Sequence, residues 1–269
     1  MKTLYVSDLD GTLLQSDETL SDYTIRTINE LVKQGVLFSY ATARSLNTSR
    51  KVTQGIQVQI PAIVYNGVMV RDYMTGEILV SEFFEQDILD LLKDLFQHDI
   101  YPIVYAFIDG QERFSYIKTH SSSPMLEFIE TRQGDPRHRE VKTVLELCQG
   151  DIFYITCIDS REKLEPFYKR YQNKHHCLYQ EDIYTHEQWL EFLPLKASKS
   201  HAIELLKEKL NCDKVVVFGD GRNDMDMFKM ADESYAVENA IDELKSLATG
   251  VIGHHNDDAV AKWLKENGV

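Results

Sequence analysis

The chain has 269 residues, of which 43% are apolar and 27% charged, a composition typical of soluble globular proteins and a length suited to two domains. Its formal net charge of −14 disfavours binding to nucleic acid or to an anionic membrane surface, because either partner requires a basic patch. The early acid Asp8 leaves no room for a signal peptide, and no stretch approaches the ~18 apolar residues of a membrane span. We therefore expect a cytoplasmic protein, and its four widely spaced cysteines are expected to be free thiols.

The first 80 residues predict the opening of a parallel α/β sheet. A buried strand is expected over 4–7, an amphipathic helix over 21–34 and a second strand over 36–41. A third short strand over 63–65 and a hairpin over 69–80 follow. Loops collect at the carboxyl ends of parallel strands, so the polar residues Asp8, Asp10 and Thr42 are expected at one edge of the sheet.

The pattern changes between residues 84 and 188. Helices there alternate with an aromatic-rich hairpin over 100–117 and with further strands over 152–158 and 177–180, which indicates an α+β insert. The α/β pattern then returns with a helix over 199–210 and an apolar strand over 215–218. The predicted fold is a Rossmann-like parallel core formed by residues 1–83 and 189–269, with an inserted domain at 84–188.

The segment 6–13 carries the most informative side chains. A short apolar strand runs into Asp8 and Asp10, and Gly11 between the acids and the next element lets the chain turn both toward one cavity. Two carboxylates about 4 Å apart repel by roughly 4 kcal/mol at an effective dielectric of ~20, so the pair favours a cation or a shared proton. An Asp-Gly turn in an ordinary hairpin is the competing interpretation at this stage.

A second acidic cluster, Asp220 and Asp224, follows the apolar strand over 215–218. Counted as an EF-hand loop from Asp220, the positions that need Gly and Glu hold Met225 and Ala231, which excludes that calcium motif. Together the four acids offer hard oxygen ligands at the ends of two strands, as Mg²⁺ prefers. A solvated loop is the alternative interpretation of the second cluster.

Several other polar residues are candidates for the binding site, and some of them also have a purely structural interpretation. Thr42 and the backbone after it could hold phosphate oxygens, and Lys199 at the start of a helix is unfavourable unless an anion lies nearby. Arg44 could contact an anionic substrate or a neighbouring acid, and Asn66 could lie beside the site or only form a turn. His186 could line the edge of the insert, although a packed or exposed histidine is more common.

In order and spacing, these motifs resemble the haloacid dehalogenase-like phosphatases. The first motif is Asp8-Leu9-Asp10-Gly11-Thr12, Thr42 and Lys199 are the second and third, and the fourth runs from Gly219 to Asp224. The insert resembles the cap of the Cof-type branch, and the resemblance covers essentially the whole chain. The second motif departs from the Thr-Gly-Arg that is frequent in the branch, because Ala43 stands at the glycine position.

The resemblance implies a role for each matched residue. Asp8 would attack phosphorus to form an aspartyl-phosphate, and Asp10 would protonate the leaving oxygen and then activate water. Asp8, Asp220 and the backbone carbonyl of Asp10 would bind Mg²⁺, with Asp224 supporting its waters. The implied phosphate-binding positions are Leu9, Thr42, Ala43, Lys199 and Asn223.

The sequence therefore predicts a Mg²⁺-dependent phosphatase of small phosphorylated metabolites that is a monomer or small homo-oligomer. Sugar phosphates are the expected substrates. A phosphomutase or phosphotransferase is one alternative, in which another hydroxyl receives the phosphoryl group. A non-catalytic sensor of phosphorylated metabolites is another, although loss of Asp8 or Asp10 would have favoured it and both are present. The fold alone does not decide among these functions.

Overall fold

The computed structural model describes residues 1–181 and 187–268, and His186 lies outside this range. Contacts divide the chain into two compact units, residues 1–81 with 197–269 and residues 82–196. No helix in the described part of the chain combines the length and apolar character needed to cross a membrane.

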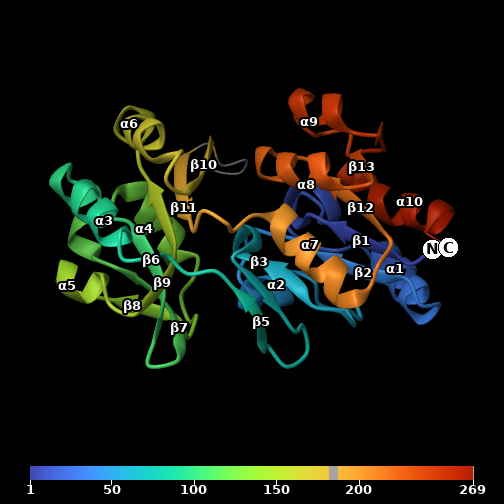
Figure 1. Ribbon diagram of the computed structural model, residues 1–269, viewed down its shortest axis with the longest axis horizontal. Helices are drawn as coiled ribbons and strands as arrows, with labels where there is room; N and C mark the ends of the chain where they lie inside the picture. The colour runs from blue at the N-terminus through green and yellow to red at the C-terminus, as the bar shows by residue number, and fades with distance from the viewer. Residues whose placement is uncertain (182–186, 269) are drawn as a thin grey trace. The chain divides into compact units, whose positions relative to one another are not determined.

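A five-stranded parallel sheet forms the core of the first unit (Figure 1), in the order β14-β13-β12-β1-β2. The strands are β1 (Thr3–Ser7), β2 (Leu37–Tyr40), β12 (Lys214–Gly219), β13 (Glu233–Ala236) and β14 (Gly250–Val251). The central strands β1 and β12 read LYVS and VVVF and are almost fully buried, as expected for parallel strands covered on both faces. The expected strands at 4–7, 36–41 and 215–218 are therefore present.

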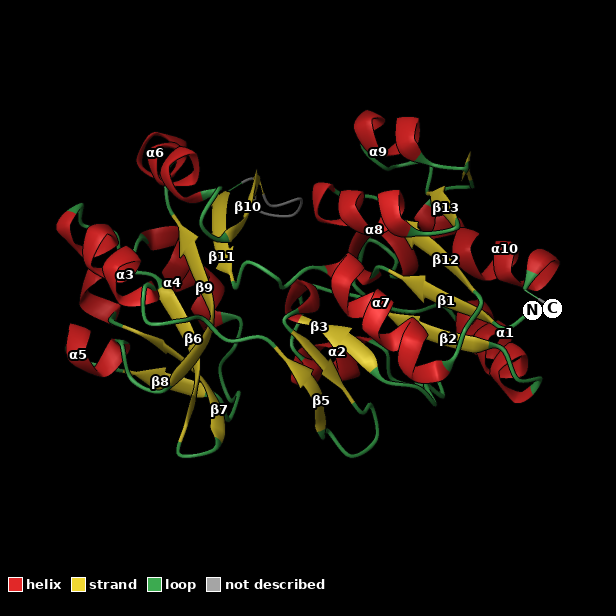
Figure 2. Cartoon of the chain, viewed as in Figure 1, coloured by secondary structure: helices red, strands yellow, loops and turns green. Residues whose placement is uncertain are grey.

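Helices flank this sheet (Figure 2), with α1 beside α10 and α7 beside α8. They are α1 (Asp22–Lys33), α2 (Leu46–Val52), α7 (Lys199–Leu210), α8 (Met225–Met230), α9 (Asp242–Leu247) and α10 (Ala259–Asn267). Serine N-caps start the helices that matter most for the site. Ser45 accepts the N–H of Thr48 at α2, and Ser198 accepts the N–H of His201 at α7.

The third predicted strand belongs to a separate small sheet. β3 (Ala62–Val64), β4 (Met69–Arg71) and β5 (Ile78–Ser81) pair antiparallel in the order β3-β4-β5. An isolated parallel bridge between Ala41 and Ile63 joins this sheet to the end of β2. The segment between β3 and β4 therefore lies beside the end of β2, where Thr42 lies.

The second unit has a six-stranded sheet in the order β10-β11-β9-β6-β7-β8, antiparallel except for the β7–β8 pair. Its elements are α3 (Ile88–Gln97), β6 (Ile103–Ile108), β7 (Gln111–Tyr116), α4 (Ser123–Glu130), β8 (His138–Glu140), α5 (Val144–Leu147), β9 (Asp151–Ile158), α6 (Arg161–Tyr171), β10 (His176–Glu181) and β11 (Gln188–Leu193). Apolar residues of α3, α6, β6 and β9 form its core. The boundary expected at residue 189 falls inside β11, which pairs with β9 and β10 of this unit.

Candidate active site

Three of the four predicted acids converge at the carboxyl edge of the parallel sheet. Asp8 follows β1 and Asp220 follows β12, and these strands are direct neighbours, with Ser7 opposite Phe218. One carboxylate oxygen each from Asp8, Asp220 and Asp224 lies within 4.8 Å of the others. Residues more than 200 positions apart thus form a single acidic cluster because parallel pairing aligns the ends of their strands.

Lys199 provides the cation of this cluster. Its Nζ lies 2.6 Å from Asp8 Oδ1 and 2.7 Å from Asp224 Oδ1, and only 1% of its side chain is exposed. Burial lowers the pKa of the ammonium, but the charges of Asp224 and Asp8 outweigh this and raise it above its ordinary value. The lysine at the N-terminus of α7 is therefore stabilised by two carboxylates, which offset the unfavourable helix dipole.

One lysine does not balance three carboxylates. Burial raises the pKa of Asp8 well above its usual range, and the neighbouring charges of Asp224, Asp220 and Asp10 raise it further, against the opposing charge of Lys199. Burial and the charge of Asp224 likewise raise the pKa of Asp220 to about 7. The cluster is therefore short of positive charge. Its oxygen-only donor set and clustered geometry fit a hard divalent cation such as Mg²⁺.

Hydrogen bonds fix the orientation of the two acids after β12. Thr12 Oγ1 donates to Asp220 Oδ1 at 2.8 Å. Asp224 Oδ2 accepts the backbone N–H groups of Asp220 and Gly221 at 2.9 and 3.0 Å, which closes the loop on itself. Sequence analysis assigned no role to the Thr12 hydroxyl, although its position inside the first motif was the available signal.

Gly11 permits the close approach of the two acidic loops. Its φ is +74°, and a Cβ placed there would lie 2.5 Å from Asp220 Oδ2. Asn239 Nδ2 donates to the carbonyl of Gly11 at 2.8 Å, and Asn239 Oδ1 accepts the N–H of His255 at 3.2 Å. The segment around Asn239 therefore holds the first loop in place from the C-terminal part of the chain.

The predicted phosphate-binding residues lie on two further segments. Thr42 is fully buried, its N–H donates to the carbonyl of Ile63 at 3.0 Å, and its Oγ1 accepts the N–H of Arg44 at 3.1 Å. Asn223 Nδ2 donates to Asn66 Oδ1 at 3.1 Å. Asn66 has a left-handed φ of +51° and is buried, so the Asn-Gly turn after β3 also contacts a predicted site residue.

Leu9 is buried and directly follows Asp8, whereas Ala43, which directly follows Thr42, is exposed. Gly67 explains why the turn after β3 lies so near α7. A Cβ at this glycine would lie 2.0 Å from the carbonyl oxygen of Ser198, the N-cap of the helix that begins with Lys199.

The carboxylate of Asp10 is oriented differently from the other three. Arg44 Nε donates to Asp10 Oδ2 at 2.8 Å, and Arg44 Nη2 lies 2.5 Å from Asp10 Oδ1 and 2.7 Å from Glu18 Oε2. Of the two partners considered for Arg44, the structure shows the neighbouring acid. The side chain of Asp10 is 24% exposed, whereas that of Asp8 is 7% exposed.

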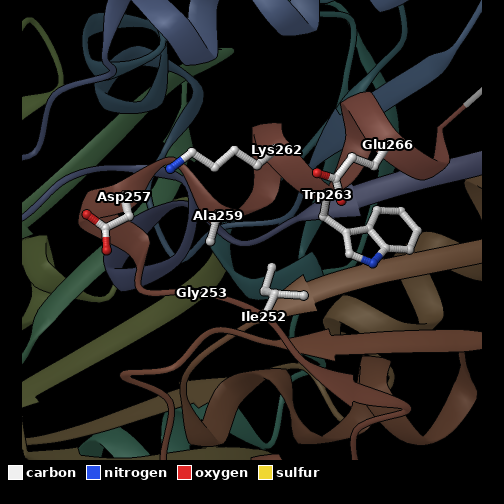
Figure 3. A pocket seen from close by; sticks show the side chains of 7 residues that line it. All are labelled: Ile252, Gly253, Asp257, Ala259, Lys262, Trp263 and Glu266. Atoms are coloured by element: carbon white, nitrogen blue, oxygen red, sulfur yellow. The ribbon is translucent and has the colours of Figure 1, made fainter.

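A pocket of about 350 Å³ elsewhere in the first unit contains none of the predicted site residues (Figure 3). Its walls come from the segment before α10 and from α10 itself: Ile252, Gly253, Asp257, Ala259, Lys262, Trp263 and Glu266. It holds no cluster of acids comparable to that of Asp8, Asp220 and Asp224, so the acidic cluster is the better candidate for the active site.

Known proteins resemble this chain along its whole length. A family model described as haloacid dehalogenase-like hydrolase matches residues 5–264. A putative phosphatase of Buchnera aphidicola is 27% identical, with 99% of this chain and 98% of the relative covered. The 5-amino-6-(5-phospho-D-ribitylamino)uracil phosphatase of Bacillus subtilis is 25% identical, with 98% of this chain and 96% of the relative covered.

Solved structures show the same fold. A haloacid dehalogenase-like hydrolase from B. subtilis superposes with a TM-score of 0.81 at 22% identity, and the match covers all of both chains. A protein from Thermotoga maritima gives a TM-score of 0.77 at 26% identity, with 99% of this chain and 97% of that chain covered. Both the parallel core and the inserted unit are therefore part of a recurring architecture.

Proposed function

The chain belongs to the haloacid dehalogenase-like hydrolase family and is a phosphatase, and from this premise we propose that it hydrolyses small phosphorylated metabolites through an aspartyl-phosphate on Asp8. The observation that carries the proposal is the buried carboxylate of Asp8, which lies against Lys199 and within the cluster that Asp220 and Asp224 complete. Attack by Asp8 brings an anionic phosphoryl group toward an anionic carboxylate, so it requires positive charge nearby. Lys199 supplies one such charge at 2.6 Å from Asp8 Oδ1.

Two carboxylates divide the chemistry. Asp8 attacks phosphorus, so that a bond forms between its oxygen and phosphorus while the bond from phosphorus to the leaving oxygen breaks. Asp10 gives its proton to the leaving oxygen and then takes one from the water that hydrolyses the aspartyl-phosphate. The second step returns Asp8 as a free carboxylate and Asp10 as a protonated acid, which completes the cycle.

Asp8, Asp220 and Asp224, with the backbone carbonyl of Asp10, are the proposed Mg²⁺ site. The cation would supply positive charge opposite the phosphoryl oxygens. Lys199 contributes a fixed charge beside Asp8 and Asp224. The remaining proposed phosphate contacts are Leu9, Thr42, Ala43 and Asn223.

We propose phosphorylated sugars or sugar alcohols as substrates and the inserted unit, residues 82–196, as the source of substrate specificity. One relative is named for a substrate with a phosphorylated ribityl group. A panel of sugar phosphates and phosphorylated sugar alcohols, assayed for phosphate release with Mg²⁺ and with a chelator, tests both the substrate class and the metal. An added acceptor sugar that becomes phosphorylated would reveal a transferase instead.

The decisive variant is Asp8→Asn, which keeps the shape of the side chain and removes its nucleophilic charge. We expect turnover to fall by several orders of magnitude while thermal unfolding remains cooperative. Asp109→Asn is the matched control, because Asp109 is exposed in the β6–β7 turn at φ +50°, a conformation that asparagine also tolerates. Hydrolysis by Asp8→Asn at a rate near that of the wild type would refute the nucleophile assignment.

A further inference from the structure

Arg44 binds Asp10 through both of its carboxylate oxygens. The Nε group donates to Oδ2 at 2.8 Å, and Nη2 reaches Oδ1 at 2.5 Å, so the planar guanidinium meets the carboxylate edge to edge. Such a two-point contact fixes the plane of the carboxylate as well as its position, which a lysine ammonium does not do.

Both ends of Arg44 are themselves held. Its backbone N–H donates to Thr42 Oγ1 at 3.1 Å, and the next residue, Ser45, is the N-cap of α2. At the other end, Nη2 also lies 2.7 Å from Glu18 Oε2. The backbone N–H of Glu18 in turn donates to the carbonyl of Gln15 at 2.9 Å, in a loop where Glu18 has a φ of +61°.

Asp10 needs such a restraint more than the other acids do. It lies in the turn over residues 9–13, is followed by the left-handed Gly11, and has a side chain that is 24% exposed. Asp224, by contrast, is fully buried and bonds two backbone N–H groups. An exposed carboxylate without a fixed partner occupies several rotamers, and a proton donor displaced by about 1 Å can cost ~10²-fold in rate.

We propose that Arg44 is a positioning residue that orients the carboxylate of Asp10 for proton transfer, with Glu18 fixing the guanidinium from its other side. This inference rests on the proposed function, in which Asp10 serves as acid and then as base. Each carboxyl oxygen has two lone-pair sites, so Asp10 can accept from Arg44 at one site of each oxygen and still hold a proton at another. That proton passes to the leaving oxygen in the first step and is replaced by one from water in the second. Arg44 also balances a negative charge beside the acidic cluster.

The test compares two variants, Arg44→Lys and Arg44→Ala, on two substrates. Arg44→Lys keeps the positive charge but removes the two-point contact of the guanidinium with the Asp10 carboxylate. We expect kcat/KM for an alkyl phosphate such as glycerol phosphate to fall about 100-fold in both variants. The fall should be several-fold smaller for p-nitrophenyl phosphate, because its leaving group departs without a proton. Arg50→Ala is the control. Arg50 lies in α2, and its guanidinium donates to a backbone carbonyl, that of Met74, where Arg44 donates to a carboxylate.

A double-mutant cycle with Asp10→Asn, measured on p-nitrophenyl phosphate, isolates the coupling between the two residues. We expect Arg44→Lys to add little to the loss caused by Asp10→Asn, because its effect passes through that side chain. Fully additive losses, equal losses on both substrates, or an increase confined to KM would overturn the inference. Asp8→Asn assayed alongside separates this outcome from failure of the proposed function, since only the latter would leave that variant active.

Discussion

Asp8 and Asp10 are two residues apart, yet the structure places them in two different electrostatic environments. Asp8 is buried with Asp220 and Asp224 around a single lysine, whereas Asp10 is partly exposed and paired with an arginine. The buried cluster has three carboxylates to one ammonium, while Asp10 shares one arginine with the exposed Glu18. The difference suits the two tasks that we propose for these residues: attack on phosphorus by Asp8 and proton exchange at the partly exposed Asp10.

The two acids also differ in the basic residue that pairs with each: Lys199 pairs with Asp8, and Arg44 pairs with Asp10. A lysine ammonium is a compact charge with three donors, which suits a position between the oxygens of two acids. The planar guanidinium of arginine donates two parallel hydrogen bonds, which suits a single carboxylate, such as that of Asp10, whose orientation has to be fixed. Removal of Lys199 should therefore disturb charge balance and folding, whereas changes near Asp10 should chiefly alter the rate of proton transfer.

The largest effect is expected from Lys199→Ala. Removing one partner of a buried ion pair costs about 3–5 kcal/mol, because the remaining charges stay buried without compensation. We expect this loss in urea unfolding of the metal-free protein, together with weaker phosphate binding and slower turnover. Lys93→Ala, which breaks an exposed pair with Asp90, should cost no more than ~1 kcal/mol. If Lys199→Ala changed thermal stability alone, the lysine would have a purely structural role.

The charge deficit of the buried cluster predicts a pH dependence of stability. The pKa of Asp220 is raised to about 7 in the folded protein, so between about pH 4 and pH 7 the folded state holds a proton that the unfolded state has lost. The free energy of unfolding of the metal-free protein should therefore fall as the pH rises through this window. If Mg²⁺ binds the proposed site, it should oppose the fall, because it would bind the folded state alone.

Asp220→Asn should flatten this pH profile, whereas Asp109→Asn should leave it unchanged, as measured by chemical unfolding at a series of pH values. An identical profile in wild type and Asp220→Asn would show that the buried cluster does not carry the predicted excess of negative charge.

The close approach of the two acidic loops can be tested with Gly11→Ala. The substitution combines a φ of +74° with a Cβ 2.5 Å from Asp220 Oδ2, so we expect a loss of about 1–3 kcal/mol and weaker Mg²⁺ binding by calorimetry. Gly110→Ala is a matched control, because Gly110 has a φ of +73° and no atom within 4 Å of the added Cβ. Equal effects of the two variants would assign the whole cost to backbone strain.

The smallest effect is expected from Glu18→Gln. The glutamate side chain is 46% exposed, so its pair with Arg44 should contribute no more than ~1 kcal/mol and should weaken as salt is added. Turnover of an alkyl phosphate should fall less than in Arg44→Lys, and added salt should reduce the difference from the wild type. A loss as large as that of Arg44→Lys would mean that Glu18 itself takes part in proton transfer.

Local patterns identified most elements of the first unit. The helix expected over 199–210 is α7, and the strand expected over 215–218 lies within β12, because helical periodicity and a continuous apolar run are strong short-range signals. The segment over 188–193 was harder to place. Its aromatic and apolar residues suit a strand, but its place in the second unit depends on pairing with β10 and with β9, which ends 30 residues earlier.

The sequence by itself determined which residue types lie at the carboxyl ends of β1 and β12, since acids and a glycine follow each strand along the chain. Only the tertiary structure decided how the charges pair: Lys199 contacts Asp8 and Asp224, and Arg44 contacts Asp10 and Glu18. A charged side chain can meet any acid that folding brings within reach. Parallel strand pairing and the close approach at Gly11 select which acids those are.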